Sequence, residues 1–239
     1  MSMLITICAR GGSKGIPGKN TKNLHGKPLI AYTIAQAQAF AAKHDADIAL
    51  STDDLEIRSI ADRCGLHTDY LRPAELATDS AGKEAAMRHA LQNEEQRRGK
   101  RYDILLDLDV TSPLRTQQDL QEALVILEAD PHALNIFSVN PAHRNPYFNM
   151  VEQAADGYYR LSKIPAQPIL SRQTAPKVYD LNASFYFFRR AFFDSGCKTP
   201  FSDRALIYVM PHICFDLDEP EDFLFLEYLM DKQLLGFAL

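Results

Sequence analysis

The 239-residue chain lacks the features that define several large classes of protein. No apolar run approaches the length that crosses a bilayer, and Arg10 and Lys14 come too early for a signal peptide. The four cysteines are scattered and form no C-x-x-C pair, which indicates reduced thiols in a cytoplasmic protein. The net charge of -5 is mildly acidic and dispersed, so the sequence predicts no surface for nucleic acid.

Several catalytic and nucleotide-binding signatures are also absent. The seven histidines form no H-x-x-x-H pair, which argues against a zinc site. No G-x-S-x-G elbow supports a covalent serine mechanism. Neither Gly11 nor Gly12 has a glycine five residues further on, so there is no Walker A loop, and no G-x-G-x-x-G fingerprint is present.

A glycine-rich loop does follow the first apolar run, Leu4–Ala9. It extends from Arg10 to Asn20 and reads R-G-G-S-K-G-I-P-G-K-N. Glycines allow backbone amides to approach an anion closely, and three cations, among them Lys14 and Lys19, offset its charge. In isolation such a loop is as often an ordinary surface turn. Because it follows a predicted first strand, where open α/β sheets bind ligands, it indicates a polyphosphate and hence a nucleotide.

Apolar, β-rich runs alternate with helical patterns along the chain. This alternation predicts a single α/β domain over residues 1–239, with a mainly parallel sheet covered by helices on both faces. The predicted strands are 4–9, 47–51, 104–108, 135–139 and 184–188, and the predicted helices are 28–43, 55–64, 83–96, 117–128 and 221–235.

Residues 141–182 depart from this alternation, because they are rich in proline and aromatic residues. Proline breaks helices and aromatic residues favour strands and contact surfaces, so we expect an inserted β-rich arm. Such an arm would cover the active site, mediate self-association, or do both.

Two Asp-Leu-Asp tripeptides, 107–109 and 216–218, each follow an apolar stretch. Residues two apart in a strand point to the same face, so each tripeptide offers two carboxylates from one side. A single aspartate here is more often a cap or turn residue. Two such pairs together with a phosphate-type loop favour a Mg²⁺ site instead.

Two arginines have open interpretations. Thr111–Arg115 is either a turn leading into a helix with Thr116 as its N-cap, or a set of hydroxyls and a guanidinium at the edge of the sheet. Arg172 either pairs with a substrate carboxylate or is an ordinary surface residue.

Taken together and in this order, these motifs resemble the acylneuraminate cytidylyltransferases, which activate nonulosonic (sialic-type) acids. The resemblance covers nearly the whole chain and rests on residues 9–20, 51–53, 72–77, 111–115 and 215–218. It implies a Rossmann-like three-layer α/β/α fold of the nucleotidyltransferase type, in which residues 141–182 form a dimerisation arm, and therefore a homodimer.

The resemblance also implies roles for particular residues. CTP would contact Arg10, Gly12, Ser13, Lys14, Lys19 and Asn20 in the first loop, and Arg72, Ala81 and Lys83 around its base and ribose. Mg²⁺ would be bound by Asp216 and Asp218, with Asp109 as a further ligand. The sugar would contact Asp109, Arg172, Asn182 and Tyr186, and the catalytic set would be Arg10, Lys19, Asp216 and Asp218.

The substrate is narrowed by one departure from the family pattern, in which Asp109 replaces a glutamine. With the segments 144–149 and 172–184, this variant most resembles the bacterial branch that activates legionaminic acid. The expected reaction transfers CMP from CTP to the anomeric hydroxyl of N,N'-diacetyllegionaminic acid and releases pyrophosphate. The alternatives are a CMP-N-acetylneuraminate synthetase, a CMP-Kdo synthetase, and a catalytically silent nucleotide-binding module.

Overall fold

The structure is a computed structural model that describes residues 1–12, 15–78 and 80–239. It divides into two compact units, one formed by residues 1–138 and 182–239 and the other by residues 139–181. The larger unit contains the main sheet and its covering helices. The smaller unit overlaps the predicted inserted arm, residues 141–182, and begins two residues before it.

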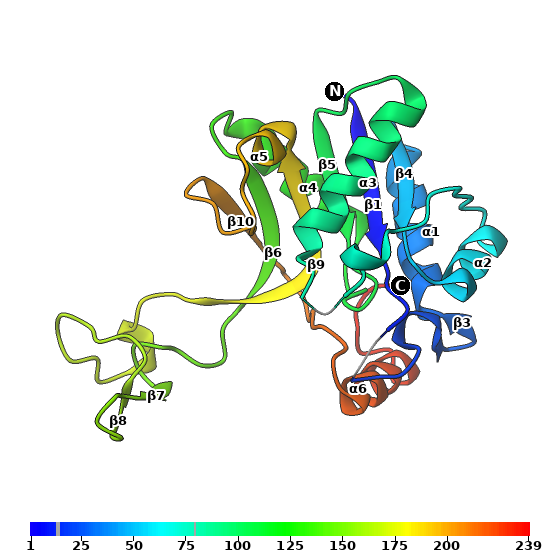
Figure 1. The fold of residues 1–239 in the computed structure, drawn as a ribbon. Helices are drawn as coiled ribbons and strands as arrows, with labels where there is room; N and C mark the ends of the chain where they lie inside the picture. The colour runs from blue at the N-terminus through cyan, green and yellow to red at the C-terminus, as the bar shows by residue number, and fades with distance from the viewer. Residues whose placement is uncertain (13–14, 79) are drawn as a thin grey trace. The chain divides into compact units, whose positions relative to one another are not determined.

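The main sheet is mixed, with a parallel centre (Figure 1). Its strands follow the order β10-β6-β9-β5-β1-β4. β1 pairs in parallel with β4 and β5, and β9 joins β5 in the antiparallel sense. The strand bounds are β1 Met3–Cys8, β4 Ala46–Ser51, β5 Ile104–Leu108, β6 Asn135–Pro141, β9 Tyr179–Arg189 and β10 Ala205–Val209.

Helices cover both faces of this sheet, as the alternation of strands and helices predicts. In Figure 1, α3 lies in front of β1, whereas α1 packs on the other face, where it contacts α2 and α4. The helix bounds are α1 Leu29–Ala41, α2 Leu55–Arg63, α3 Lys83–Arg98, α4 Gln117–Ala129, α5 Arg190–Asp194 and α6 Pro220–Asp231. The predicted three-layer α/β/α architecture is therefore confirmed.

The parallel centre of the sheet explains where the polar residues gather. Five of the six residues of β1 are buried, as expected of a strand covered on both faces. The register pairs Cys8 with Ser51 and Thr6 with Asp107, so β1, β4 and β5 all end at the same edge. The loops that follow these three strands consequently meet there.

Helix caps set several of the loop boundaries. Asp54 caps α2 by accepting hydrogen bonds from the amides of Glu56 and Ile57. Thr116 and Asp119 form a capping box at the start of α4. The interpretation of the 111–115 segment as a turn with Thr116 as N-cap is thus confirmed.

The pattern-based prediction locates the central elements and misses the edges. β10 is not predicted, and neither are the hairpins β2 (Asn23–Leu24) with β3 (Lys27–Pro28) and β7 (Val151–Gln153) with β8 (Tyr159–Leu161). The apolar stretch 213–215 before the second acidic pair is not a strand. It is held instead by separate bonds, such as that from Ser112 Oγ to the Phe215 carbonyl oxygen (3.1 Å).

The smaller unit, residues 139–181, contains the β7–β8 hairpin and the 3-10 helix η3, Arg172–Thr174. Asn145 organises its chain by donating to the Pro176 carbonyl and by accepting from the Tyr147 amide. Much of its apolar surface is exposed, at Met150, Val151, Tyr158, Tyr159, Ile164 and Leu170.

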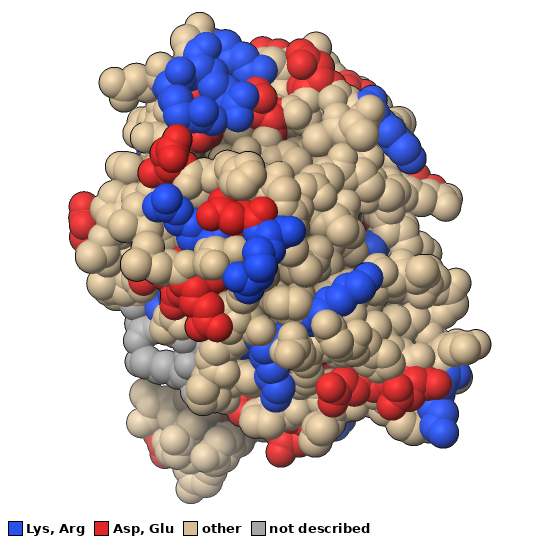
Figure 2. Space-filling view, turned by 90° about the vertical axis from the view of Figure 1, so that its right-hand side faces the viewer, with Lys and Arg blue, Asp and Glu red and all other residues tan. Residues whose placement is uncertain are grey.

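Figure 2 shows that basic and acidic side chains are interspersed over the face that it presents. No helix in the described part of the chain is both long and apolar enough to traverse a lipid bilayer.

Candidate active site

The glycine-rich loop leaves the carboxyl end of β1 and passes close to two neighbouring segments. A Cβ atom on Gly11 would lie 2.5 Å from Asp54 Oδ2, and one on Gly15 would lie 2.2 Å from the carbonyl oxygen of Asp218. A larger residue would therefore displace the Asp54 side chain at position 11 and the Asp218 backbone at position 15. A Cβ on Gly12, by contrast, would meet no protein atom within 4 Å, so this glycine faces open space.

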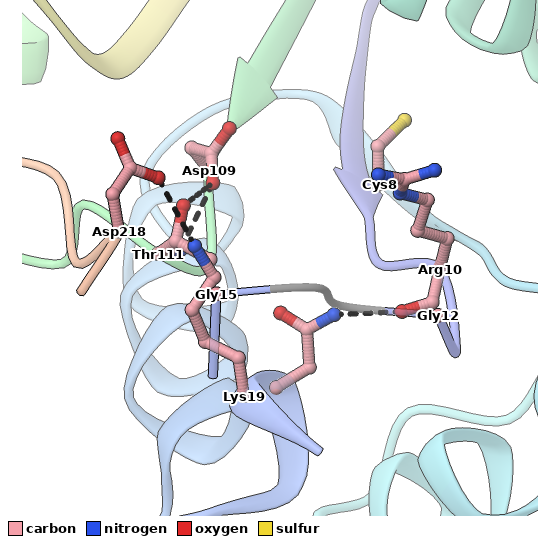
Figure 3. A pocket seen from close by; sticks show the side chains of 9 residues that line it. Cys8, Arg10, Gly12, Gly15, Lys19, Asp109, Thr111 and Asp218 are labelled. Atoms are coloured by element: carbon pink, nitrogen blue, oxygen red, sulfur yellow. Dashed lines mark hydrogen bonds and ion pairs between the residues drawn. The ribbon is translucent and has the colours of Figure 1, made fainter. Parts of the chain in front are cut away.

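This open space belongs to a cavity of about 310 Å³ at the edge of the sheet. In Figure 3, the carboxylates of Asp109 and Asp218 lie on one side of the cavity, and Arg10 and Cys8 lie on the other. Its lining is Cys8, Arg10, Gly12, Gly15, Lys19, Asn20, Asp109, Thr111 and Asp218. The structure thus brings Arg10 and Lys19 of the first loop and a carboxylate some 200 positions later to one hollow.

Lys19 links these two parts of the chain directly. Its Nζ atom donates to the Leu217 carbonyl oxygen at 2.5 Å and lies 3.3 Å from Asp218 Oδ1. Asn20 supports the other side of the loop, because its Nδ2 atom donates to the Arg10 carbonyl oxygen at 2.9 Å. The loop is therefore held in place while the Asp218 carboxylate stays largely exposed.

A second cavity, of about 240 Å³, adjoins the first through Cys8, Arg10 and Asp109. Its further lining is Arg72, Leu76, Thr78, Ala81, Gly82, Lys83 and Ala86. The Arg10 guanidinium spans the boundary and donates to the Ala77 carbonyl oxygen at 3.5 Å. Predicted phosphate and base residues thus line two connected hollows.

Arg72 shapes the wall of the second cavity from a buried position. Its guanidinium donates from Nε to Ser51 Oγ at 2.9 Å and from Nη2 to the Ser51 carbonyl oxygen at 2.6 Å. The Arg72 amide donates to the Thr52 carbonyl oxygen at 2.8 Å. These bonds fix the loop that begins at Arg72 to the end of β4.

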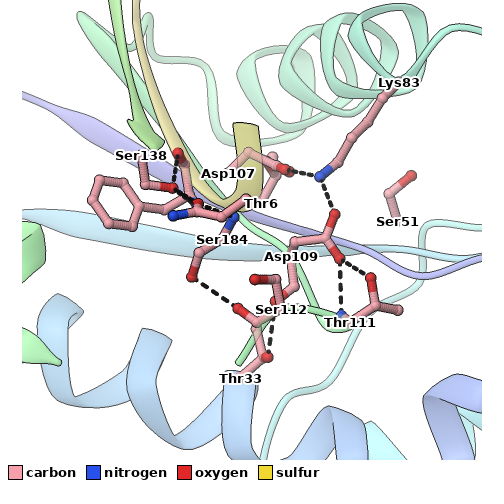
Figure 4. A network of polar contacts seen from close by, with 12 residues as sticks. Thr6, Thr33, Ser51, Lys83, Asp107, Asp109, Thr111, Ser112, Ser138 and Ser184 are labelled. Atoms are coloured by element: carbon pink, nitrogen blue, oxygen red, sulfur yellow. Dashed lines mark hydrogen bonds and ion pairs between the residues drawn. The ribbon is translucent and has the colours of Figure 1, made fainter. Parts of the chain in front are cut away.

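The first acidic pair is held by Lys83 at the start of α3 (Figure 4). Lys83 Nζ lies 2.7 Å from Asp107 Oδ2 and 2.6 Å from Asp109 Oδ2. This ammonium and the hydrogen bonds from Thr111 keep the pKa of Asp109 below its usual value despite burial. The neighbouring carboxylates likewise raise the pKa of Lys83.

The second acidic pair is less fully compensated, because Lys19 Nζ lies 3.3 Å from the exposed Asp218 carboxylate and no ion pair of Asp216 is found among the described residues. Asp216 is half-buried, and its Oδ1 atom is buried without a hydrogen-bond partner in the described structure. Burial first, and then the charges of Asp109 and Asp218, raise the pKa of Asp216 to about 6. An uncompensated carboxylate beside a second acid suits a divalent cation, so these residues fit Mg²⁺.

The described residues contain no preformed cage of three or more His, Cys, Asp or Glu side chains. This arrangement agrees with the usual mode of Mg²⁺, which takes one or two carboxylates and completes its shell with water and substrate phosphates. Asp216 and Asp218 could therefore hold the ion together with a nucleotide.

Other predicted residues lie elsewhere. The Asn182 side-chain oxygen accepts from Ser138 Oγ at 2.6 Å and from the Ser184 amide, and Asn182 lines neither cavity. Tyr186 is buried on β9, with its ring centroid 5.4 Å from Lys83 Nζ. Arg172 belongs to the smaller unit, where it donates to the Ala142 carbonyl oxygen. Ser13 and Lys14 lie outside the described residues.

Arg115 is not an edge residue, which corrects one interpretation of the 111–115 segment. It is 1% exposed, and its guanidinium donates to the carbonyl oxygens of Asp109, Ser112 and Ser184 at 2.8–2.9 Å. Burial lowers its pKa to about 10. It therefore braces the loop after β5 from inside the core.

Two features of the site are missed by pattern analysis. Cys8 lines both cavities, and burial beside Asp107 raises its thiol pKa to about 12, so it is a neutral wall residue. Lys83 is predicted only as a nucleotide contact, and its pairing with Asp107 and Asp109 is not. No sequence pattern predicts this pairing, because it depends on the folded chain bringing the start of α3 close to the end of β5.

The comparisons with known proteins concern the family and the fold of the chain. Residues 4–234 match the family model described as Cytidylyltransferase. The chain is 37% identical over 234 residues to post-translational flagellin modification protein B of Campylobacter coli, covering 98% of this chain and 97% of that protein. It is 36% identical over 235 residues to the CMP-N,N'-diacetyllegionaminic acid synthase of Campylobacter jejuni subsp. jejuni serotype O:2, with coverage of 98% and 97%.

A solved structure shares the fold. It is a CMP:2-keto-3-deoxy-manno-octonic acid synthetase complexed with CTP, with a TM-score of 0.67 and 18% sequence identity. The alignment covers 98% of this chain and 100% of that chain. The family match over residues 4–234 and the full-length relatives show that this chain belongs to the cytidylyltransferase family.

Proposed function

We propose that this protein transfers CMP from CTP to the anomeric hydroxyl of a nonulosonic acid, N,N'-diacetyllegionaminic acid, in a Mg²⁺-dependent reaction. One observation carries the proposal. Arg10 and Lys19 of the first loop and Asp218 of the distant acidic pair line a single cavity, with open space over Gly12. Opposite charges across one hollow suit a polyphosphate with its cation.

The two cavities divide the nucleotide between them in this proposal. The triphosphate occupies the first cavity, where Arg10 and Lys19 offset its charge and the open face of Gly12 admits close approach of phosphate oxygens. The base and ribose occupy the second cavity, against the loop fixed by Arg72. Arg10, which lines both, is then placed beside the α-phosphate.

The chemistry is an in-line displacement at the α-phosphorus. The anomeric oxygen forms a bond to phosphorus, the bond from phosphorus to the bridging oxygen breaks, and pyrophosphate leaves with that electron pair. Such transfers depend on positioning and charge stabilisation more than on covalent catalysis. Arg10 and Lys19 stabilise the charge that develops on the phosphates, and a carboxylate at the cavity accepts the hydroxyl proton.

Asp216 and Asp218 would hold Mg²⁺ when the nucleotide binds. The ion would supply Lewis-acid stabilisation of phosphate charge. The protein's own contribution is the carboxylate pair, kept close to the first loop by the contact between Gly15 and the Asp218 carbonyl oxygen.

Legionaminic acid is proposed as the substrate because a synthase of its CMP derivative is 36% identical over nearly the full length of this chain. A pseudaminic acid cytidylyltransferase of Campylobacter jejuni is 38% identical over only 123 residues, or 52% of this chain. The Kdo synthetase shares the fold at 18% identity. The full-length relative therefore favours legionaminic acid.

Mass spectrometry of products tests this choice. The protein is incubated with CTP, Mg²⁺ and, separately, N-acetylneuraminic, legionaminic, pseudaminic and Kdo acids. We expect CMP-N,N'-diacetyllegionaminic acid as the dominant product, with none in the matched reaction that contains EDTA. A dominant product from another acid would overturn the substrate, and no product from any of them would overturn the enzyme proposal.

We also propose a homodimer formed through the smaller unit. Its exposed apolar residues include Tyr158, Ile164 and Leu170, whose exposed fractions are 73%, 79% and 89%. Apolar surface gathered in this way on a soluble chain is typical of a protein contact. Analytical ultracentrifugation tests it, since a monomer at micromolar concentration would contradict the proposal.

A further inference from the structure

Lys83 carries a feature that nucleotide binding does not explain. Its ammonium lies 2.7 Å from Asp107 Oδ2 and 2.6 Å from Asp109 Oδ2 (Figure 4). The same ammonium lies 5.4 Å from the centre of the Tyr186 ring. The cation is thus enclosed by two carboxylates and an aromatic face. A cation held so closely by the protein is already satisfied before any ligand binds.

The remaining carboxylate oxygens of this first pair are also occupied. Thr6 Oγ1 donates to Asp107 Oδ1 at 2.7 Å. The Thr111 amide and Thr111 Oγ1 both donate to Asp109 Oδ1 at 2.9 Å. Three of the four oxygens therefore accept a hydrogen bond, and the fourth, Asp107 Oδ2, forms an ion pair with the Lys83 ammonium at 2.7 Å.

Asp216 presents the opposite condition a short distance away. Its Oδ1 atom is buried without a partner in the described structure, and its carboxylate feels the negative charges of Asp109 and Asp218. Lys19 opposes these charges, and it is engaged by the Leu217 carbonyl and Asp218. Among the described residues, the carboxylate left without an ion pair is therefore Asp216 of the second pair.

We propose that the Lys83 ammonium occupies the place that a metal ion would take at Asp109. A divalent cation then binds through Asp216 and Asp218 alone. The inference rests on the proposed function, since it concerns the ion of that reaction. A divalent ion bound to Asp109 Oδ2 would lie against the ammonium and be repelled by it. Asp109 and Lys83 are then positioning residues.

Their action passes through Thr111. Asp109 Oδ1 accepts two hydrogen bonds from Thr111, and Thr111 lines the first cavity. The Thr111 side chain also acts to lower the pKa of Asp216. Lys83 fixes Asp109, and Asp109 fixes Thr111 at the edge of the cavity. Asp216 Oδ1, which has no hydrogen-bond partner among the described residues, is left available for the ion.

Mn²⁺ binding to the nucleotide-free protein tests this inference, with free Mn²⁺ measured by electron paramagnetic resonance. The wild-type protein should bind one Mn²⁺ per chain. Asp218→Asn should lose it, whereas Asp109→Asn should keep the stoichiometry of one, with an affinity lowered by no more than about a hundredfold, as for a residue that acts through a ligand. Loss of Mn²⁺ binding in Asp109→Asn as complete as in Asp218→Asn would overturn the proposal, because it would make Asp109 a ligand itself.

Lys83→Met gives the converse test, because it frees the first pair of its cation. We expect a second Mn²⁺ per chain, and a return to one in Lys83→Met/Asp109→Asn. Two Mn²⁺ in the wild-type protein, one of them lost in Asp109→Asn, would contradict the role of Lys83. Failure of the proposed function shows differently, as product formation that persists in EDTA whatever the Mn²⁺ stoichiometry.

Discussion

The two Asp-Leu-Asp tripeptides of this chain have the same sequence and opposite electrostatic environments. Asp107 and Asp109 end a buried strand, and Lys83 lies within 2.7 Å of both. Asp216 and Asp218 lie in an extended segment outside any strand, where Asp216 has one buried oxygen without a partner in the described structure. Both carboxylates of the first pair contact one ammonium, whereas among the described residues only Asp218 of the second pair has a cation, Lys19 at 3.3 Å, and the charge of Asp216 is left uncompensated.

The difference shows that neighbours in space decide what a carboxylate pair does. A pair neutralised by a buried ammonium contributes to the fold and to the placement of nearby groups. A pair left with uncompensated charge destabilises the empty protein and gains from a bound cation. Substitutions in the two pairs should therefore separate stability from activity.

The largest effect is expected from Asp218→Ala. This substitution removes a largely exposed carboxylate, one of the two proposed Mg²⁺ ligands. It should lower turnover at least about a hundredfold. The melting temperature should change by no more than about 2 °C, since an exposed side chain contributes little to folding. Steady-state pyrophosphate release and calorimetry measure the two quantities. Near-normal Mg²⁺-dependent turnover would contradict the assigned role.

Asp107→Asn should have the reverse profile. Asp107 is fully buried, and the substitution removes one of the two charges that pair with Lys83. We expect a loss of about 2 kcal/mol in the free energy of unfolding, less than for a fully orphaned buried charge because Asp109 remains. Urea denaturation gives the value, with Asp218→Asn as the matched control. Equal losses of unfolding free energy in Asp107→Asn and Asp218→Asn would contradict the proposed difference between the two acidic pairs.

Asp216→Asn should stabilise the metal-free protein above pH 6. The pKa of Asp216 is raised in the folded protein to about 6, so its stabilising contribution is complete below about pH 4 and is lost as the pH rises through 6. The neutral amide avoids that loss, and we expect a gain on the order of 1 to 2 kcal/mol at pH 7.5 that vanishes near pH 4. Denaturation at both pH values, in EDTA, measures it. A variant less stable than wild type at pH 7.5 would show that the charged Asp216 carboxylate does not destabilise the folded protein.

The glycines of the first loop should give the smallest and sharpest contrast. Gly15→Ala places a methyl group against the Asp218 carbonyl oxygen and should cost on the order of 1 kcal/mol of stability. Gly12→Ala meets no protein atom, so stability should stay within about 0.5 kcal/mol while the Michaelis constant for CTP rises. Calorimetry and kinetics on both variants test this. An unchanged Michaelis constant in Gly12→Ala would remove the nucleotide from that side of the cavity.

The central elements of the fold could be predicted from the sequence because, in them, the local pattern of apolar residues matches the pattern of burial. The predicted strand 104–108 is observed as Ile104–Leu108, and the predicted helix starts at Leu55, Lys83 and Gln117 are those observed. Strand β10 was missed because an edge strand is specified by its partner more than by its own five residues. Residues 213–215 have an apolar pattern but are held by loop contacts.

The site could be predicted where its residues belong to motifs. Arg10, Lys19 and Asp218 line one cavity, as the motifs suggested. Contacts that depend on the packing of other segments could not be predicted. One of the two interpretations of the 111–115 segment placed Arg115 at the edge of the sheet. Its guanidinium is instead buried in the core, where it donates to three backbone carbonyl oxygens. The Lys83 bridge depends on the packing of α3 against β1 beside β5, which no sequence spacing encodes.

The most direct test of the unequal acidic pairs is a crystal structure of the protein with CTP and Mn²⁺, analysed by anomalous scattering. We predict one anomalous peak per chain, coordinated by Asp216 and Asp218, with Lys83 still between Asp107 and Asp109. A peak coordinated by Asp107 or Asp109, or Mn²⁺ that bypasses the second pair altogether, would contradict the account.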